Sequence, residues 1–132
     1  MKISLLCGLA VVLGLSALPA LAHHSFAAEY DGKKVVDLTG TVTKVEWMNP
    51  HARFYLDVKD ESGKVTPWEF ELGSPNGLMR QGWTRNSMKI GDLITVQGSM
   101  AKDGSNLANA RTVTLANGKK VFAGSATDSD GK

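Results

Sequence analysis

A strict alternation of apolar and polar residues between positions 52 and 72 limits what this chain can fold into. In the first half of this stretch every second residue is apolar: Ala52, Phe54, Leu56 and Val58. In the second half three apolar residues are spaced in the same way: Trp68, Phe70 and Leu72. The two runs flank a Gly-containing loop at 60–63, so they predict an antiparallel hairpin with one buried face. Pro67 within the second run predicts a free edge or a bulge there.

Further segments rich in β-branched residues or bounded by turn sequences extend the predicted sheet. The strands expected outside the hairpin cover 36–47, 93–100, 107–115 and 120–122. In the first of them the apolar residues change face, so we expect a bulge near Thr43-Lys44 that restores their phase and bends the strand. Asn117-Gly118 predicts a tight turn between the last two strands.

A different pattern in residues 73–86 predicts a helix of about two turns. Ser74 is placed as an N-cap and Pro75 as the first helical residue, with Leu78, Met79 and Trp83 on one face. Three strands, a short helix and further strands are the element order of a barrel of the OB type. We therefore predict an all-β fold, a small OB-like Greek-key barrel of five to six strands with one short helix between strands 3 and 4. An open antiparallel sandwich is the alternative.

Residues 1–22 have the three parts of a secretory signal peptide: a basic start, the apolar run 3–18 and the small-residue pattern Ala20-Leu21-Ala22. A membrane anchor is the alternative, because the apolar stretch is close to the ~20 residues that span a bilayer. Glycines within the run, Pro19 and the lack of a basic stop after Ala22 favour cleavage. We expect cleavage after Ala22, a periplasmic location and a processed protein that does not span the membrane.

A chain of 132 residues has room for one folded domain. The expected organisation is a signal peptide at 1–22, an N-terminal segment at 23–34, the OB-like barrel at 35–123 and a disordered tail at 124–132. The single cysteine lies within the signal peptide, so no disulfide is expected. A formal net charge of +2 is too weak to indicate a nucleic-acid partner, and Phe54, Trp68 and Phe70 are expected in the core.

The histidines are the strongest candidates for chemistry. Cleavage after Ala22 would give His23 a free α-amine beside its imidazole, and a nitrogen-rich chelate of this kind favours copper. His24 or His51 would supply a further nitrogen, and Met48 a soft thioether ligand. OB-fold cuprous chaperones of the periplasm use the same ingredients, although not this spacing. We therefore predict a periplasmic copper-binding module with His23, His24, His51 and Met48 as candidate ligands.

Other interpretations of these residues stay open. The two N-terminal histidines also fit a solvated terminus, Met48 fits packing at a strand end, and His51 fits a hydrogen bond within the turn. The alternative function is a structural or interaction domain that binds a periplasmic protein or an envelope polymer without metal. Its surface would be the exposed strand residues Arg53, Tyr55, Glu69 and Glu71, which cross-strand charge pairing also explains.

Enzymatic activity is not expected. The sequence has no Gly-x-Ser-x-Gly motif, no phosphate-binding loop and no cysteine nucleophile in the processed chain. A mono-copper oxidase built on His23 is the least favoured alternative.

Several short motifs are spread along the chain: Ala20-Leu21-Ala22, His23-His24-Ser25-Phe26, Gly40-x-Val42, Trp47-x-Asn49-Pro50-His51, Phe54-x-Leu56, Trp68-x-Phe70-Glu71 and Gly91-Asp92-x-Ile94-x-Val96-x-Gly98. Together they resemble a family of small exported bacterial proteins of unknown function. The resemblance covers nearly all of the processed chain and implies a periplasmic, OB-like β-barrel. It implies no activity, substrate or catalytic residue.

Overall fold

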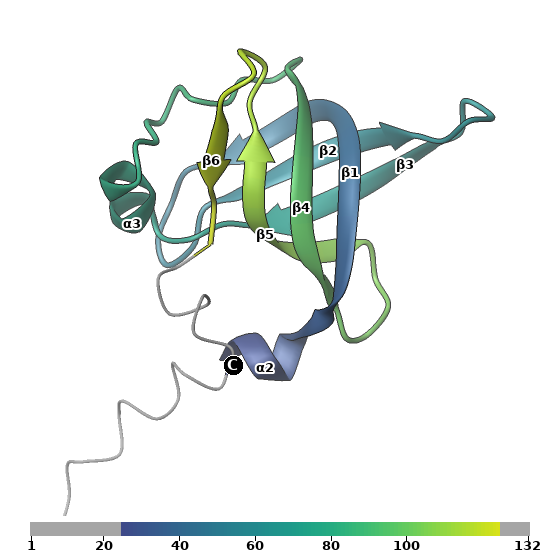
Figure 1. The fold of residues 1–132 in the computed structure, drawn as a ribbon, viewed down its shortest axis with the longest axis horizontal. Helices are drawn as coiled ribbons and strands as arrows, with labels where there is room; N and C mark the ends of the chain where they lie inside the picture. Colours follow the sequence, from purple (N-terminus) through teal and green to yellow (C-terminus); the bar gives the residue numbers. More distant parts are fainter. Residues whose placement is uncertain (1–24, 125–132) are drawn as a thin grey trace, which may run out of the picture.

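The segments with strand-like patterns pair into one antiparallel sheet that curls into a barrel (Figure 1). The computed structural model describes residues 25–124. Its strands are β1 (Tyr30–Glu46), β2 (Arg53–Lys59), β3 (Val65–Glu71), β4 (Leu93–Ala101), β5 (Leu107–Thr114) and β6 (Lys120–Phe122). Its helices are α2 (Ser25–Glu29) and α3 (Pro75–Arg80).

The strand order, β3-β2-β1-β4-β5-β6, is closed by a parallel pairing of β3 with β5. This pairing sets Glu69–Glu71 beside Leu107–Asn109. The short helix α3 lies between β3 and β4, where the sequence predicts it. The predicted OB-like barrel is therefore confirmed.

The alternating hairpin supplies the centre of the core. Phe54, Leu56 and Phe70 are fully buried, and the rings of Phe54 and Phe70 stack with their centroids 5.1 Å apart. Trp68 is partly buried and packs against this core. Pairing of β3 with β5 begins only at Glu69, so the preceding residues have β2 alone as a neighbour. The free edge predicted from Pro67 is confirmed.

Strand β1 is bent and pairs with both β2 and β4, with a register shift in each pairing. Its register with β2 shifts between Val42 and Lys44, which confirms the predicted bulge. A second shift, against β4, lies between Asp31 and Val35. The strand begins at Tyr30, before the expected barrel boundary at residue 35. The segment leading into the barrel is therefore part of the sheet.

Helix α3 confirms the predicted cap but not the predicted face. The backbone N–H of Gly77 donates to Ser74 Oγ at 3.2 Å. Leu78 is buried, whereas Met79 is 51% exposed. Trp83 lies beyond the helix and is buried in the core, and its Nε1 donates to the Phe122 carbonyl at 2.8 Å. The helix has six residues, close to the predicted length of about two turns, but it ends at Arg80, so helical spacing does not extend to Trp83.

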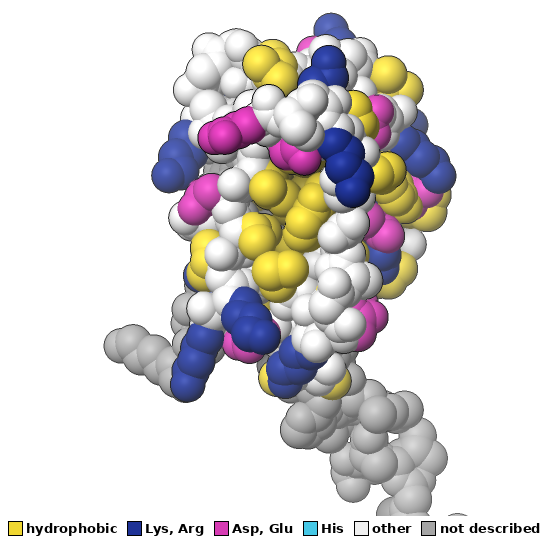
Figure 2. All heavy atoms as spheres, turned by 90° about the vertical axis from the view of Figure 1, so that its right-hand side faces the viewer, with side chains coloured by type: hydrophobic (Ala, Val, Ile, Leu, Met, Phe, Trp, Pro, Cys, Tyr) yellow, Lys and Arg dark blue, Asp and Glu magenta, His cyan; other side chains and the backbone are white. Residues whose placement is uncertain are grey.

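The surface carries charges of both signs. Figure 2 shows hydrophobic side chains gathered at the centre of one face of the molecule, with basic and acidic side chains interspersed around them. No helix within residues 25–124 is long and apolar enough to cross a membrane.

Candidate functional site

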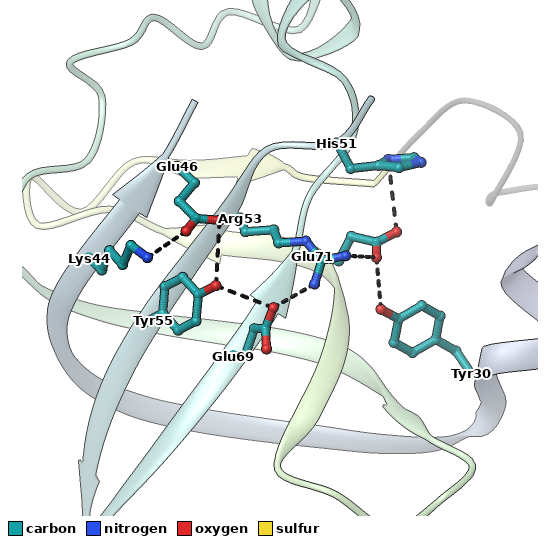
Figure 3. Close-up of polar contacts among 8 residues, drawn as sticks. All are labelled: Tyr30, Lys44, Glu46, His51, Arg53, Tyr55, Glu69 and Glu71. Carbon is teal, nitrogen blue, oxygen red and sulfur yellow. Dashed lines mark hydrogen bonds and ion pairs between the residues drawn. The ribbon is translucent and has the colours of Figure 1, made fainter. Parts of the chain in front are cut away.

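Polar side chains meet on one side of the β1–β2–β3 sheet, where they form a row that runs from Lys44 to Tyr30 (Figure 3). We call this set the polar face, and its members are Tyr30, Lys44, Glu46, His51, Arg53, Tyr55, Glu69 and Glu71. Half of them, Arg53, Tyr55, Glu69 and Glu71, alternate with core residues along β2 and β3. The alternation that buries the apolar residues therefore also aligns these polar ones.

Arg53 links the two glutamates of β3. The β2–β3 register places Arg53 opposite Glu71 and Tyr55 opposite Glu69, so the expected cross-strand pairing is present. Arg53 Nη1 lies 2.5 Å from Glu69 Oε1, and Nη2 lies 3.2 Å from Glu71 Oε2. The hydrogen bond with Glu69 raises the pKa of the Arg53 guanidinium. The guanidinium therefore holds two like charges side by side on one strand.

Glu71 is buried, which corrects the expectation that both glutamates are exposed. Glu71 as a whole is only 8% exposed. Tyr30, at the start of β1, donates its hydroxyl to Glu71 Oε2 at 2.9 Å. Burial, followed by the charge of Glu71, raises the pKa of the Tyr30 hydroxyl far above its usual value. Tyr30 covers Glu71 because β1 extends further toward the N-terminus than its sequence pattern indicates.

His51 lies at the end of the polar face, before β2. Its Nδ1 is 3.1 Å from the Leu72 carbonyl oxygen and 3.8 Å from Glu71 Oε1. The side chain is 38% exposed. A neutral ring that donates from Nδ1 to the carbonyl has its free lone pair on Nε2. The hydrogen bond of His51 reaches the end of β3 and not its own turn, so the expected hydrogen bond within the turn is wrong, and the contact with Leu72 orients the ring.

Of the other predicted metal ligands, Met48 lies within the described part of the chain. Met48 is 56% exposed, and its neighbour Trp47 is partly buried against the core. His23 and His24 lie outside the described residues. Between residues 25 and 124, no three His, Cys, Asp or Glu side chains are grouped as metal ligands.

The bulge in β1 places Lys44 opposite Tyr55 at the other end of the polar face. Lys44 Nζ lies 2.6 Å from Glu46 Oε1 and 5.1 Å from the centroid of the Tyr55 ring. Tyr55 Oη is 3.4 Å from Glu46 Oε2 and from Glu69 Oε1. These longer contacts are weak hydrogen bonds, so the position of Tyr55 depends mainly on packing.

An open cavity of about 390 Å³ adjoins this end of the polar face. We call it the hairpin cavity, and its lining residues are Thr43, Lys44, Tyr55, Leu56, Pro67, Trp68, Glu69 and Asn106. Sequence reasoning singled out Tyr55 and Glu69 as surface candidates but missed Thr43, Lys44 and Asn106. The predicted bulge near Thr43-Lys44 was the sequence signal that could have identified Thr43 and Lys44. Asn106 reaches the cavity because its carbonyl accepts from the Glu69 amide at 3.0 Å.

A second open cavity, of about 630 Å³, lies beside α2 and the start of β1. Its Lys102 side chain donates to the Ala27 carbonyl, and Arg111 Nη2 donates to the Gly32 carbonyl at 2.6 Å. Arg111 Nε also donates to Ser99 Oγ at 2.8 Å. These two cations therefore hold the N-terminal part of the described chain against the barrel.

Comparisons with known proteins agree with the fold. A family model described as "Family of unknown function (DUF6152)" matches residues 11–110. No curated protein matches the sequence. Among solved structures, the chain is similar to the mitochondrial single-stranded DNA-binding protein Rim1 of S. cerevisiae, with a TM-score of 0.50 and 8% identity over 62% of this chain and 92% of that chain. At this identity the similarity shows an OB-like fold and nothing about the ligand.

Proposed function

The chain belongs to the family of unknown function DUF6152, and we propose that it is a binding module whose ligand lies in the hairpin cavity beside the polar face. The observation that carries this proposal is the position of that cavity. It lies between the β1 bulge, the β2–β3 hairpin and the loop after β4. In barrels of this type the face of strands 2 and 3, with the loops beside it, is a common place for ligands.

The groups around the cavity are already held in place. Arg53 positions Glu69 through a 2.5 Å contact, and the Asn106 backbone is tied to Glu69. Groups that are ordered before binding lose less conformational entropy when a ligand arrives. A fixed set of polar groups beside the Tyr55 ring is therefore suited to recognition.

Backbone NMR of isotopically labelled protein tests this proposal. We would add separate protein, polysaccharide and small-molecule fractions of a bacterial envelope extract and follow the amide signals. A ligand of the proposed site shifts the amides of Thr43, Tyr55 and Glu69. Shifts confined to the second cavity at Lys102 and Arg111, or no shifts with any fraction, contradict the proposal.

We also propose that the protein acts in the periplasm after cleavage following Ala22. Support comes from the basic start, apolar run and small-residue pattern of residues 1–22. Intact-mass measurement on protein from a periplasmic fraction tests this directly. A mass that begins at His23 agrees with the proposal, and an unprocessed mass in the membrane fraction contradicts it.

Copper binding is a second candidate function, favoured by the orientation of His51. Metal-binding histidines commonly donate the N–H of their second ring nitrogen to a carbonyl or carboxylate, and this hydrogen bond fixes the orientation of the ring. His51 Nδ1 faces the Leu72 carbonyl and Glu71 in this manner, and leaves Nε2 for a ligand. Tyr30, which follows closely after His23 and His24 in the sequence, contacts the same Glu71. A site shared by the processed N-terminus and His51 would use this arrangement.

A Cu(II) titration by calorimetry separates this candidate from a solvated terminus. The protein beginning at His23 is compared with a form that carries one extra residue before it and with the His51→Ala variant. A shared site binds one copper ion tightly, and both changes weaken the affinity by about tenfold or more. Equal weak binding by all three forms rules the site out. A loss of copper affinity only in the extended form, and not in His51→Ala, restricts the ligands to the N-terminus.

A further inference from the structure

The lining of the hairpin cavity combines one aromatic side chain on the polar face with short polar groups. Tyr55 supplies aromatic surface, and Thr43 and Asn106 supply a hydroxyl and an amide. Glu69 adds a carboxylate that is held by Arg53. A mainly apolar site with a few placed polar groups, in a volume of about 300–1,000 Å³, is typical of small-ligand pockets. The hairpin cavity, at about 390 Å³, falls in this range.

The charges at the cavity are paired with one another. Lys44 contacts Glu46 at 2.6 Å, and Arg53 contacts Glu69 and Glu71 at 2.5 and 3.2 Å. The polar face therefore presents no cation without a carboxylate beside it. Single-stranded nucleic acids bind through basic grooves that neutralise phosphates, and the interspersed charges in Figure 2 form no such groove on the face it shows. The three carboxylates of this face outnumber its two cations, Lys44 and Arg53, and so disfavour an anionic ligand.

The cavity is open along the unpaired part of β3. Pro67 and Trp68 precede the residues at which β5 joins β3, so no strand within residues 25–124 covers this side. A chain-like ligand can therefore place one unit in the cavity while its neighbours extend into solvent. A free peptide strand is a poorer fit as an added strand, because Pro67 lacks the amide that such pairing uses.

We propose that the hairpin cavity binds one unit of a neutral oligosaccharide chain. The apolar face of a sugar ring would lie on the aromatic surface of Tyr55. Its hydroxyls would exchange hydrogen bonds with the Asn106 amide, the Thr43 hydroxyl and the Glu69 carboxylate. This inference rests on the proposed function and names the ligand class of that same site.

Calorimetric titrations with cellohexaose, chitohexaose and a thymidine oligonucleotide test the ligand class. At least one of the two neutral saccharides should bind, and the oligonucleotide should not. Asn106→Ala removes an exposed amide while its backbone carbonyl still accepts from Glu69, and should weaken saccharide binding by about tenfold. Tyr55→Ala removes the aromatic surface and should weaken it at least as much. Asn86→Ala, an exposed asparagine outside the cavity lining, is the matched control and should bind as the unmodified protein does.

Circular dichroism of each variant separates lost binding from lost folding, and Asn106→Ala keeps the test valid where Tyr55→Ala unfolds. Saccharide binding that is unchanged in Asn106→Ala overturns the proposal, as does tighter binding of the oligonucleotide. Failure of both saccharides also overturns it. Where envelope fractions still shift the amides of the cavity, the broader binding function stands and only the saccharide class is wrong. Where the envelope fractions shift no amides of the cavity, the saccharide class and the broader binding function are both wrong.

Discussion

The Tyr30 hydroxyl donates a 2.9 Å hydrogen bond to Glu71 Oε2, and this contact joins the start of β1 to the end of β3. Tyr30 is 2% exposed, and Glu71 also accepts from Arg53. The N-terminal strand is thereby fastened to the polar face through a buried carboxylate. Because both partners are buried, loss of either costs the other a buried hydrogen bond.

Tyr30→Phe should lower the free energy of unfolding by about 1–3 kcal/mol, because Glu71 loses a buried donor. Urea denaturation measures the change. Tyr55→Phe is the matched control: its hydroxyl contacts are 3.4 Å long, and its effect should be about 0.5 kcal/mol or less. Equal effects of the two substitutions would show that the Tyr30 hydroxyl has no special role.

Tyr30 should also make stability depend on alkaline pH. Its pKa is raised in the folded state by burial and by Glu71. The folded state thus favours the protonated hydroxyl, and this contribution is complete below the unfolded pKa of about 10 and declines as the pH rises above it. The free energy of unfolding should therefore fall above about pH 10.

The alkaline decline should be smaller in Tyr30→Phe than in Tyr55→Phe, which retains Tyr30. Urea denaturation at increasing pH provides the comparison. The ultraviolet absorbance of tyrosinate in folded Tyr55→Phe should appear only as the protein unfolds. Ionisation of Tyr30 near its ordinary pKa in the folded protein would contradict this interpretation.

Gly40→Ala should destabilise the barrel by about 1–3 kcal/mol. A Cβ at Gly40 would lie 2.6 Å from the Asp57 carbonyl oxygen, a backbone atom of the neighbouring strand. Gly32→Ala is the control, because the atom nearest to a Cβ at Gly32 would be Arg111 Nη2, at an ordinary contact distance of 3.7 Å. Thermal or urea unfolding of both variants measures the difference, and similar stability would argue against close approach of β1 and β2.

Trp83→Phe should loosen β6 because the indole Nε1 donates to the Phe122 carbonyl at 2.8 Å. A loss of about 1–3 kcal/mol is expected from the hydrogen bond and the reduced volume. Amide hydrogen exchange should accelerate most in β6. Trp47→Phe, at a partly buried position on the same core, should leave exchange in β6 unchanged.

Local pattern in the sequence was sufficient for the strands and their buried faces. The alternation around Phe54 and Phe70 predicts which side of the hairpin enters the core, because successive strand residues point to opposite faces. The phase change near Thr43-Lys44 predicts the bulge, and Ser74 before Pro75 predicts the start of α3. Each of these depends on neighbours within a few positions, so the sequence itself contains the information.

The sequence alone could not predict the burial of Glu71, the position of Asn106 or the hydrogen bond of Trp83. Glu71 has the period of an exposed strand residue, and only the path of β1 brings Tyr30 over it. Asn106 is a loop residue whose place beside Glu69 follows from the parallel pairing of β3 with β5. Periodicity reports the side of a strand on which a residue lies, whereas these contacts join segments far apart in the chain. Only closure of the barrel decides which of those segments meet.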